Sequence, residues 1–504
     1  MLTLLIFFPA IGAILGFLIE QNSIKLYGAM IAFIELILAI VLCFGIDFDI
    51  PFSFLYQIRI IPNIGVNYIV GVDGVSALLI AMSAFMSFIA IVTVQAEQNL
   101  KNLIISVLFL EMTMMGVFAS LDAVVFYMFW ELSLLPMLYI IGAWGSGRRI
   151  YAAIKFFIYT FFGSVFMLVG LIFMAYLHFK ATGALSFSLI DWYKLPLEFN
   201  TQIWLFLAFA FAFAVKTPMF PFHTWLPYAH GQAPTIGSVL LAAVLLKMGT
   251  YGFVRFSLPL FPDASLYLTN FICILAVIMV IYTALVAFAQ DDMKQVIAYS
   301  SISHMGVVVL GIFSLNLIGI SGSVFFMISH GIVSGALFLL VGMIYDRCHT
   351  KLIGEFGGLS QVMPRYALIF AIVMLGSIGL PLTIGFVGEF LSLIGVFKFS
   401  KIFAFFGGVG IIVGAIYMLS LYMRVFFGEC KNEKNLALND LNLKEVLSIV
   451  PLCLLIIALG ICPNLALKPI ENGVENIINL MQKRAVGIET KNILSNLNQG
   501  QKDE

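Results

Sequence analysis

Long apolar runs separated by short polar stretches follow one another along almost the whole chain. A helix that spans a bilayer needs about 20 mostly apolar residues, and about fourteen segments meet this requirement. They begin near residues 2, 25, 75, 102, 121, 150, 202, 234, 266, 295, 318, 366, 402 and 444. Because only helices and closed barrels satisfy every backbone group in lipid, the pattern predicts an all-α polytopic membrane protein.

Two of the predicted spans, the seventh and the twelfth, carry proline inside an apolar run. Pro218 and Pro221 follow Lys216, and Pro381 precedes Glu389. Proline cannot donate to the carbonyl four residues earlier, so both helices are predicted to break. Broken helices at membrane depth are tolerated where they line a hydrated cavity, and we expect water beside Lys216.

The sequence also contains a weak internal repeat. GSVFMLVG at 163–170 resembles GALFLLVG at 335–342, with identical residues at five of the eight positions. The two copies are separated by an odd number of predicted spans, so the second copy is inverted, as in many transporters. We therefore divide the chain into N-terminal helices (1–100), a first five-helix repeat (101–260), a second, inverted five-helix repeat (261–428), and a last helix with a polar tail (429–504).

Ionisable side chains occur inside the predicted spans. They are Glu35, Glu111, Glu131, Lys216, Lys247 and Glu389. Each charged group costs about 2.5–3.5 kcal/mol at a helix centre, so each is expected to be paired, hydrated or neutral. A step of 173 residues along the chain takes Glu131 to His304 and Lys216 to Glu389, but takes Lys247 to a serine. Ionisable positions thus recur at nearly the same spacing as the repeat, whose two copies are 172 residues apart.

Groups that can take up and release protons follow this pattern through both repeats. The predicted path consists of Glu131, Lys216, Lys247, His304, His330 and Glu389. An imidazole passes protons with little driving force near neutral pH, and His223 and His230, after the first break, could form an inlet or outlet. The alternative, ion pairs that only fix helix register, stays open, and for Glu35 it is the preferred interpretation.

Composition narrows the chemistry further. The 504 residues are 62% hydrophobic and 10% charged, with a net charge of zero, so no nucleic-acid partner is expected. The six cysteines are scattered without C-x-x-C pairs, and the histidines have no metal-binding spacing. Nucleotide-binding glycine motifs are also missing. We therefore predict no cofactor and no metal site in this chain.

Basic residues in the predicted loops indicate the orientation. With the N-terminus outside, the loops predicted as cytoplasmic hold about thirteen Lys or Arg and the outer loops about six. The cytoplasmic group includes Arg148, Arg149, Arg347, Arg365, Lys444 and Lys431, the last of which lies outside the residues that the structure describes. Both termini are then expected on the outer side.

The polar tail after the last span carries apolar residues at helical spacing. Val474, Ile477, Ile478 and Met481 share one face of a helix. We predict a short amphipathic helix that lies on a neighbouring subunit or at the membrane interface.

Several long motifs connect these residues to a known family. They are FWELSLLPMLYIIG, FAVKTPMFPFHTWLPYAH, LLKMGTYGFVR, KQVIAYSSISHMG and GFVGEF. In these motifs the chain resembles the antiporter-like proton-translocating subunits of respiratory complex I, which in turn resemble the large subunits of Mrp cation/proton antiporters. The resemblance covers nearly the whole chain. Sibling subunits carry lysine where this chain has Glu389, so the chain resembles the branch with glutamate.

The resemblance implies roles for the predicted path: Glu131 and Lys216 as the regulating pair of the first half, Lys247 as the central relay, His304 and His330 as the connection, and Glu389 as the terminal site. It also implies a non-redox subunit of a proton-translocating NADH:quinone oxidoreductase in the bacterial inner membrane, driven by quinone reduction elsewhere. Its expected partners are sibling membrane-arm subunits, lipid and protons. The alternatives are an Mrp-type Na⁺/H⁺ antiporter subunit, a membrane subunit of a hydrogenase or formate-linked complex, and a structural spacer.

Overall fold

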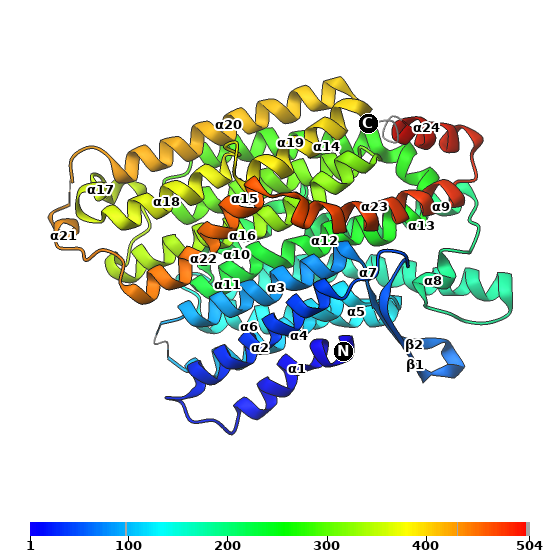
Figure 1. The fold of residues 1–504 in the computed structure, drawn as a ribbon, viewed down its shortest axis with the longest axis horizontal. Helices are drawn as coiled ribbons and strands as arrows, with labels where there is room; N and C mark the ends of the chain where they lie inside the picture. Colours follow the sequence, from blue (N-terminus) through cyan, green and yellow to red (C-terminus); the bar gives the residue numbers. More distant parts are fainter. Residues whose placement is uncertain (96–97, 431, 500–504) are drawn as a thin grey trace.

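The computed structural model describes residues 1–95, 98–430 and 432–499. They form a bundle of long helices with a small hairpin at one end (Figure 1). In the described residues, 12 helical spans are long and apolar enough to cross a membrane, and two shorter apolar helices, Leu2–Gly16 and Pro364–Ser377, accompany them. The prediction of about fourteen membrane helices is confirmed, and their starts agree closely with the expected positions.

The helices follow the order expected from the apolar pattern. The N-terminal group contains α1 (Leu2–Gly16), α2 (Ile24–Phe44) and α3 (Gly74–Thr93). The next group contains α4 (Leu100–Ala119), α5 (Ala123–Leu132), α6 (Leu134–Trp144), α7 (Arg149–Thr182), α8 (Leu189–Trp192), α9 (Phe199–Lys216), the 3₁₀ turn η2 (Phe222–Thr224), α10 (Trp225–Gln232), α11 (Thr235–Leu240), the π-helical turn η3 (Leu241–Leu245), α12 (Leu246–Gly252), the π-helical turn η4 (Phe253–Ser257) and α13 (Leu258–Leu260).

The remaining elements complete the bundle and its C-terminal tail. They are α14 (Pro262–Phe288), α15 (Met293–Ile312), α16 (Leu317–Cys348), the 3₁₀ turn η5 (Ile353–Glu355), α17 (Leu359–Val362), α18 (Pro364–Ser377), α19 (Ile384–Phe399), α20 (Lys401–Phe426), α21 (Glu433–Leu436), α22 (Leu443–Ile461), α23 (Asn464–Arg484) and α24 (Ile488–Gln499). The fourth span is broken in each group of five, between α9 and α10 and between α18 and α19.

The first break satisfies its backbone with protein groups. Because Pro218 cannot donate to the carbonyl of Ala214, the N–H of Met219 does so instead, at 2.8 Å. The indole nitrogen of Trp225 donates to the carbonyl of Val215 at 2.9 Å. We expected water at the carbonyls that the prolines leave free, and at Ala214 the structure places a protein donor instead, while the indole serves Val215, whose usual donor Met219 has moved to Ala214. Buried carbonyls need partners of one kind or the other.

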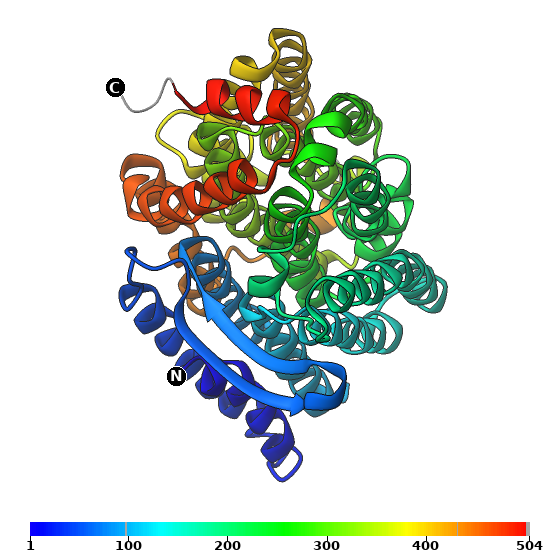
Figure 2. The ribbon, with the colours of Figure 1, turned by 90° about the vertical axis from the view of Figure 1, so that its right-hand side faces the viewer.

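A two-stranded hairpin is the one element of the described residues that departs from the all-α prediction. Strand β1 (Ser53–Ile61) pairs antiparallel with β2 (Val66–Val72), and the 3₁₀ turn η1 (Pro62–Ile64) joins them. The hairpin lies at one end of the bundle (Figure 2). Its signal was present, because Ile58 and Ile60 alternate with Gln57 and Arg59 in a period of two.

The amphipathic tail helix is present, but its position differs from the prediction. Its residues Val474, Ile477, Ile478 and Met481 are buried in α23. This apolar face packs against α3, α13 and α16 of the same chain, and α23 lies at the end that carries the hairpin (Figure 2). The helix thus covers its own bundle, because its apolar stripe is buried there.

A buried ion pair joins the start of α3 to the second π-helical turn. Asp73 caps α3 by accepting the backbone N–H of Ser76, and its carboxylate lies 2.7 Å from the guanidinium of Arg255. Both side chains are buried. The pair fixes the N-terminal helices to the centre of the bundle.

Replacing Arg255 by glutamine should therefore destabilise the protein strongly. The change leaves the buried Asp73 carboxylate without its cation, at an expected cost of about 3–5 kcal/mol. The effect is measured by heating the purified complex and recording the temperature at which this chain is released from it. The control is Arg424→Gln, which removes an exposed pair with Asp291 and should change little. Equal effects of the two changes would contradict the structural role of Arg255.

Candidate functional site

Lys247 lies at the centre of a helix that is interrupted by π-helical turns on both sides. Its side chain is fully buried. Its ammonium donates to the carbonyl of Ala242, in η3, at 2.5 Å, and lies 2.7 Å from Nδ1 of His330. π-Helical turns often mark functional positions in helices. Here the turn supplies a carbonyl that holds the lysine against the histidine.

Two histidines continue the polar line from Lys247 towards the second broken helix. His330, on α16, has Nε2 3.1 Å from the hydroxyl of Ser334. Its ring centroid lies 5.7 Å from that of His304, on α15. His304 in turn has Nδ1 3.1 Å from Oε1 of Glu389, on α19. The structure thus brings Lys247, His330, His304 and Glu389 into one line across the bundle.

The second break shapes the surroundings of Glu389. Gly379, in the break, has a φ of 70°, which an L side chain rarely adopts. A Cβ at this position would lie 2.5 Å from Oε2 of Glu389. A cavity of about 10 Å³, close to the minimum for one water molecule, adjoins Glu389, His304 and Tyr417. The break therefore leaves room for the carboxylate and for a small polar partner.

The first half of the predicted path has a looser arrangement. The ammonium of Lys216 is buried, donates to the hydroxyl of Ser133 at 3.4 Å, and faces the ring of Trp130 at 5.2 Å. Among the described residues no ion pair joins it to Glu131. The two charges are nevertheless close enough to act on each other. One oxygen of Glu131 has no hydrogen-bond partner in the described part.

Within the first repeat, α12 crosses the end of α9. Gly249 allows this close approach, because a Cβ there would lie 2.7 Å from the carbonyl oxygen of Phe213 and 2.8 Å from the backbone nitrogen of Thr217. Lys216, at the end of α9, and Lys247, in α12, thus lie on two helices that contact each other.

Glu35 and Glu111 lie outside this line, on α2 and α4. Both are fully buried, and none of their four carboxylate oxygens has a hydrogen-bond partner among the described residues. Their charges act on each other. The interpretation of Glu35 as half of an ion pair is not supported, because no described ion pair contains it.

Sequence reasoning gave little weight to two other buried groups. His230 is fully buried near the end of α10, and Lys294, at the start of α15, donates to the carbonyl of Ala233 at 2.6 Å. Lys294 opens the motif KQVIAYSSISHMG, so the sequence did mark it. Across the described residues, no group of three His, Cys, Asp or Glu side chains gathers as metal ligands.

The chain is similar to known membrane proteins along most of its length. The family described as NADH:quinone oxidoreductase/Mrp antiporter, TM, matches residues 120–414. NADH-quinone oxidoreductase subunit M of Rickettsia prowazekii is 46% identical over 468 residues, which are 91% of this chain and 94% of the relative. A chain of respiratory complex I from Thermus thermophilus has a TM-score of 0.88 at 31% identity, and the match covers 95% of this chain and 100% of that chain.

A more distant likeness concerns the fold alone. A chain of the Mrp complex from Dietzia sp. DQ12-45-1b has a TM-score of 0.81 at 18% identity, with coverage of 94% of this chain and 97% of that chain.

Replacing Gly379 by alanine should impair proton translocation through Glu389. The new Cβ requires a strained backbone and collides with the carboxylate. Gly183→Ala is a matched control, because Gly183 has a similar φ of 77° and a Cβ added there would meet no atom within 4 Å. We expect Gly379→Ala to lower proton uptake in reconstituted vesicles several times more than Gly183→Ala. Equal losses would mean that the backbone conformation alone matters.

Proposed function

The chain belongs to the NADH-quinone oxidoreductase subunit M family, and we propose that it carries protons along the line from Lys247 to Glu389. It is a proton-translocating membrane-arm subunit of respiratory complex I, an enzyme complex, and a multi-pass membrane protein. The proposal rests on the four titratable groups that follow one another at short distances between the π-helical turn and the second broken helix, with one step of 5.7 Å between the ring centroids of the two histidines.

A proton can move along this line in short steps. The Lys247 ammonium gives its proton to Nδ1 of His330, 2.7 Å away, and becomes a neutral amine. His330 releases a proton from Nε2, which passes to His304 through a ring rotation or a water molecule. His304 then gives a proton to the Glu389 carboxylate at 3.1 Å. Each histidine accepts a proton on one ring nitrogen and releases one from the other, so ring rotation or tautomer exchange restores its starting form before the next proton arrives.

Repulsion limits the line to one mobile proton near Lys247. Two unit positive charges about 3 Å apart repel by about 6 kcal/mol at an effective dielectric constant of 20. Lys247 and His330, at 2.7 Å, are therefore protonated one at a time. A positive charge that appears nearby drives the shared proton away from itself.

Lys216 supplies such a charge in the first half. Its ammonium lies on α9, which contacts the helix of Lys247, and the Glu131 carboxylate acts on it. When Glu131 balances Lys216, Lys247 keeps its proton. When the balance is lost, the proton moves towards Glu389. Glu131 and Lys216 thus regulate the line from Lys247 to Glu389 electrostatically, without passing a proton directly to it.

The driving force comes from quinone reduction in other subunits, and this chain supplies the proton carriers. Its partners are sibling antiporter-like subunits on both sides, together with lipid. The face with Arg148, Arg347 and Lys444 is cytoplasmic by the positive-inside rule, so both termini are periplasmic in a bacterial inner membrane. Sodium is a poor substitute for the proton, because hard cations require oxygen ligands and the centre of the line is built from nitrogen.

Removing either member of the regulating pair should slow the coupled reaction. Glu131→Gln removes the negative charge that acts on Lys216, and Lys216→Ala removes the cation itself. We expect the quinone-reductase activity of the assembled complex to fall by about tenfold or more in each variant. Near-normal activity in both, with assembly confirmed, would return the pair to a purely structural role.

Two substitutions of Glu389 separate a proton carrier from a structural carboxylate. Glu389→Lys keeps a titratable group, as in the sibling subunits, and should retain part of the pumping activity. Glu389→Gln preserves the shape and the contact with His304 but cannot titrate, so it should assemble and pump poorly. A structural role predicts the opposite order, because lysine would then place a cation beside His304. Proton uptake in proteoliposomes decides between the two orders.

A further inference from the structure

The small cavity beside Glu389 is bordered by polar groups from four helices. Its volume of about 10 Å³ is close to the smallest space that holds one water molecule. The polar residues that line it are Ser303 and His304 on α15, Ser377 at the end of α18, Glu389 on α19 and Tyr417 on α20. The cavity therefore offers one water molecule several polar partners at membrane depth.

Tyr417 reaches this cavity because glycines let α20 pack closely. A Cβ at Gly410 would lie 1.9 Å from Cγ1 of Val280, so only glycine allows this approach of α20 to α14. Gly414 lies one turn before Tyr417, and a Cβ there would lie 3.9 Å from the tyrosine hydroxyl. Both glycines border the cavity. The hydroxyl of Tyr417 thus lies beside Gly414 at the edge of the cavity.

The proton of the Tyr417 hydroxyl is already used elsewhere. Tyr417 is buried, and its hydroxyl donates to Oγ of Ser300, on α15, at 2.7 Å. A phenol has a single proton, so any further hydrogen bond to this oxygen must be accepted rather than donated. Ser303 is in a similar position, because its hydroxyl donates to the carbonyl of Val280 at 2.8 Å. Both hydroxyl groups can only accept from a molecule in the cavity.

The second broken helix supplies another acceptor. Pro381 cannot donate to the carbonyl of Ser377. At the first break the N–H of Met219 serves the corresponding carbonyl of Ala214, but no hydrogen bond among the described residues reaches the carbonyl of Ser377. A buried carbonyl needs a partner, and a molecule in the cavity that Ser377 lines can provide one.

The acceptors around the cavity match a hydronium ion better than a water molecule. A water molecule donates two hydrogen bonds, whereas a hydronium ion donates three and carries a positive charge. The Tyr417 oxygen, the Ser377 carbonyl and the Glu389 carboxylate provide three acceptors, and the carboxylate also balances the charge. When neutral His304 donates from Nδ1 to Oε1 of Glu389, at 3.1 Å, it adds no cation to the site.

We propose that this cavity binds a hydronium ion and that Tyr417 positions it for proton release from Glu389. The carboxylic acid of Glu389 gives its proton to the water molecule, so the carboxyl O–H bond breaks and a third O–H bond forms on the water. The hydronium ion then gives a proton to the next water molecule and becomes water again. The carboxylate is restored and can accept the next proton from His304. The inference rests on the proposed function and adds the group that takes the proton from Glu389.

The first test is Tyr417→Phe in the assembled complex in proteoliposomes. Phenylalanine keeps the ring but removes one acceptor of the hydronium ion. We expect the rate of proton pumping to fall about tenfold or more, because a hydrogen bond to a charged group is lost. The solvent deuterium isotope effect on pumping should increase, since proton release from Glu389 becomes slower. A packing role of Tyr417 predicts near-normal pumping and an unchanged isotope effect.

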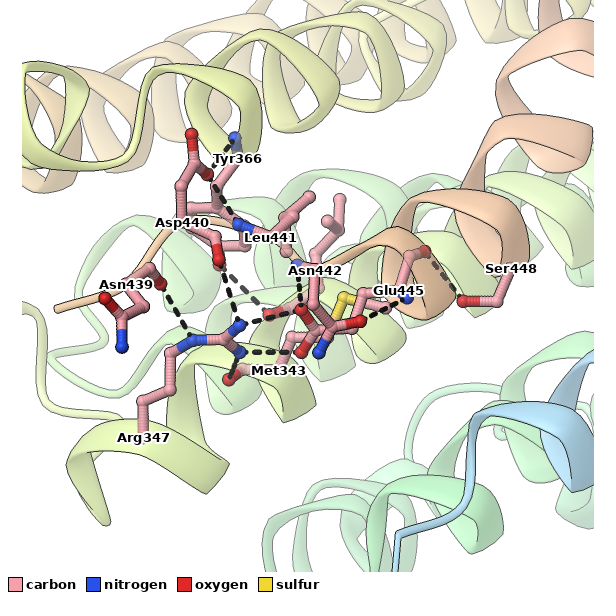
Figure 3. A network of polar contacts seen from close by, with 10 residues as sticks. Met343, Arg347, Tyr366, Asn439, Asp440, Leu441, Asn442, Glu445 and Ser448 are labelled. Atoms are coloured by element: carbon pink, nitrogen blue, oxygen red, sulfur yellow. Dashed lines mark hydrogen bonds and ion pairs between the residues drawn. The ribbon is translucent and has the colours of Figure 1, made fainter.

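Tyr366→Phe is the matched control. Tyr366 is also buried, and its hydroxyl also donates one hydrogen bond, to the carbonyl of Leu340 at 3.0 Å. It belongs to a polar network at the start of α18, where Asp440 accepts its backbone N–H (Figure 3). The length of α18, about 16 Å between the two residues, separates it from Ser377. Both variants lose one buried hydrogen bond and should release the chain at similarly lowered temperatures, but Tyr366→Phe should pump like the parent.

A second pair of variants tests the direction of the Tyr417 hydroxyl. Ser300→Ala removes the acceptor of its proton, so the hydroxyl is free to turn and donate into the cavity. A donor there opposes a hydronium ion, and we expect pumping to fall several-fold, with an increased isotope effect. Ser106→Ala removes a buried hydroxyl on α4 that donates to the carbonyl of Asn102 and should have no effect on pumping.

The outcomes separate this inference from the function on which it rests. If Tyr417→Phe and Ser300→Ala both pump like their controls while Glu389→Gln does not, the hydronium site is wrong and the proposed function stands. If Glu389→Gln also pumps normally, the proposed function itself is wrong. If Tyr417→Phe fails to assemble, the comparison of Ser300→Ala with Ser106→Ala decides.

Discussion

The contact between Lys247 and His330 organises the rest of the site. Two nitrogen bases 2.7 Å apart in a fully buried position share one mobile proton, because a second positive charge is too costly there. The ammonium needs another acceptor, and the π-helical turn supplies the carbonyl of Ala242. The imidazole needs a partner on its other side, and Ser334 provides it. The irregular backbone of this helix thus follows from the demands of one lysine.

The broken helices meet the same demand in different ways. At the first break, beside Lys216, the N–H of Met219 replaces the donor lost at Pro218, and the indole of Trp225 serves the carbonyl of Val215, which Met219 would otherwise reach. At the second break, Gly379 adopts a left-handed conformation and leaves space beside Glu389. One break therefore positions a cation, and the other makes room for a carboxylate and a small polar partner.

Much of this arrangement could be predicted from the sequence, because lipid imposes simple rules. The membrane helices and both breaks follow from apolar length and proline. The pairing of side chains could not be predicted, because it depends on how helices rotate against one another. Sequence reasoning therefore missed that Glu35 lies near Glu111, that α23 covers its own bundle, and that His230 lacks partners among the described residues. The hairpin was missed because its alternating pattern was overshadowed by the longer apolar runs.

The two proposed repeats place equivalent pairs in different states. The step of 173 residues relates Glu131 and Lys216 to His304 and Glu389. In the second half the pair is in direct contact at 3.1 Å, whereas among the described ion pairs none joins Glu131 to Lys216. Lys247 lies between a closed pair and an open one. In the proposed mechanism, an open first pair leaves the charge of Lys216 less balanced, which drives the shared proton towards His330, while the closed second pair offers a carboxylate to receive it. When Glu131 and Lys216 form a pair, the repulsion by Lys216 weakens and Lys247 can be protonated again. Alternation of the two pairs between open and closed states is therefore enough to make proton transfer run from Lys247 to Glu389.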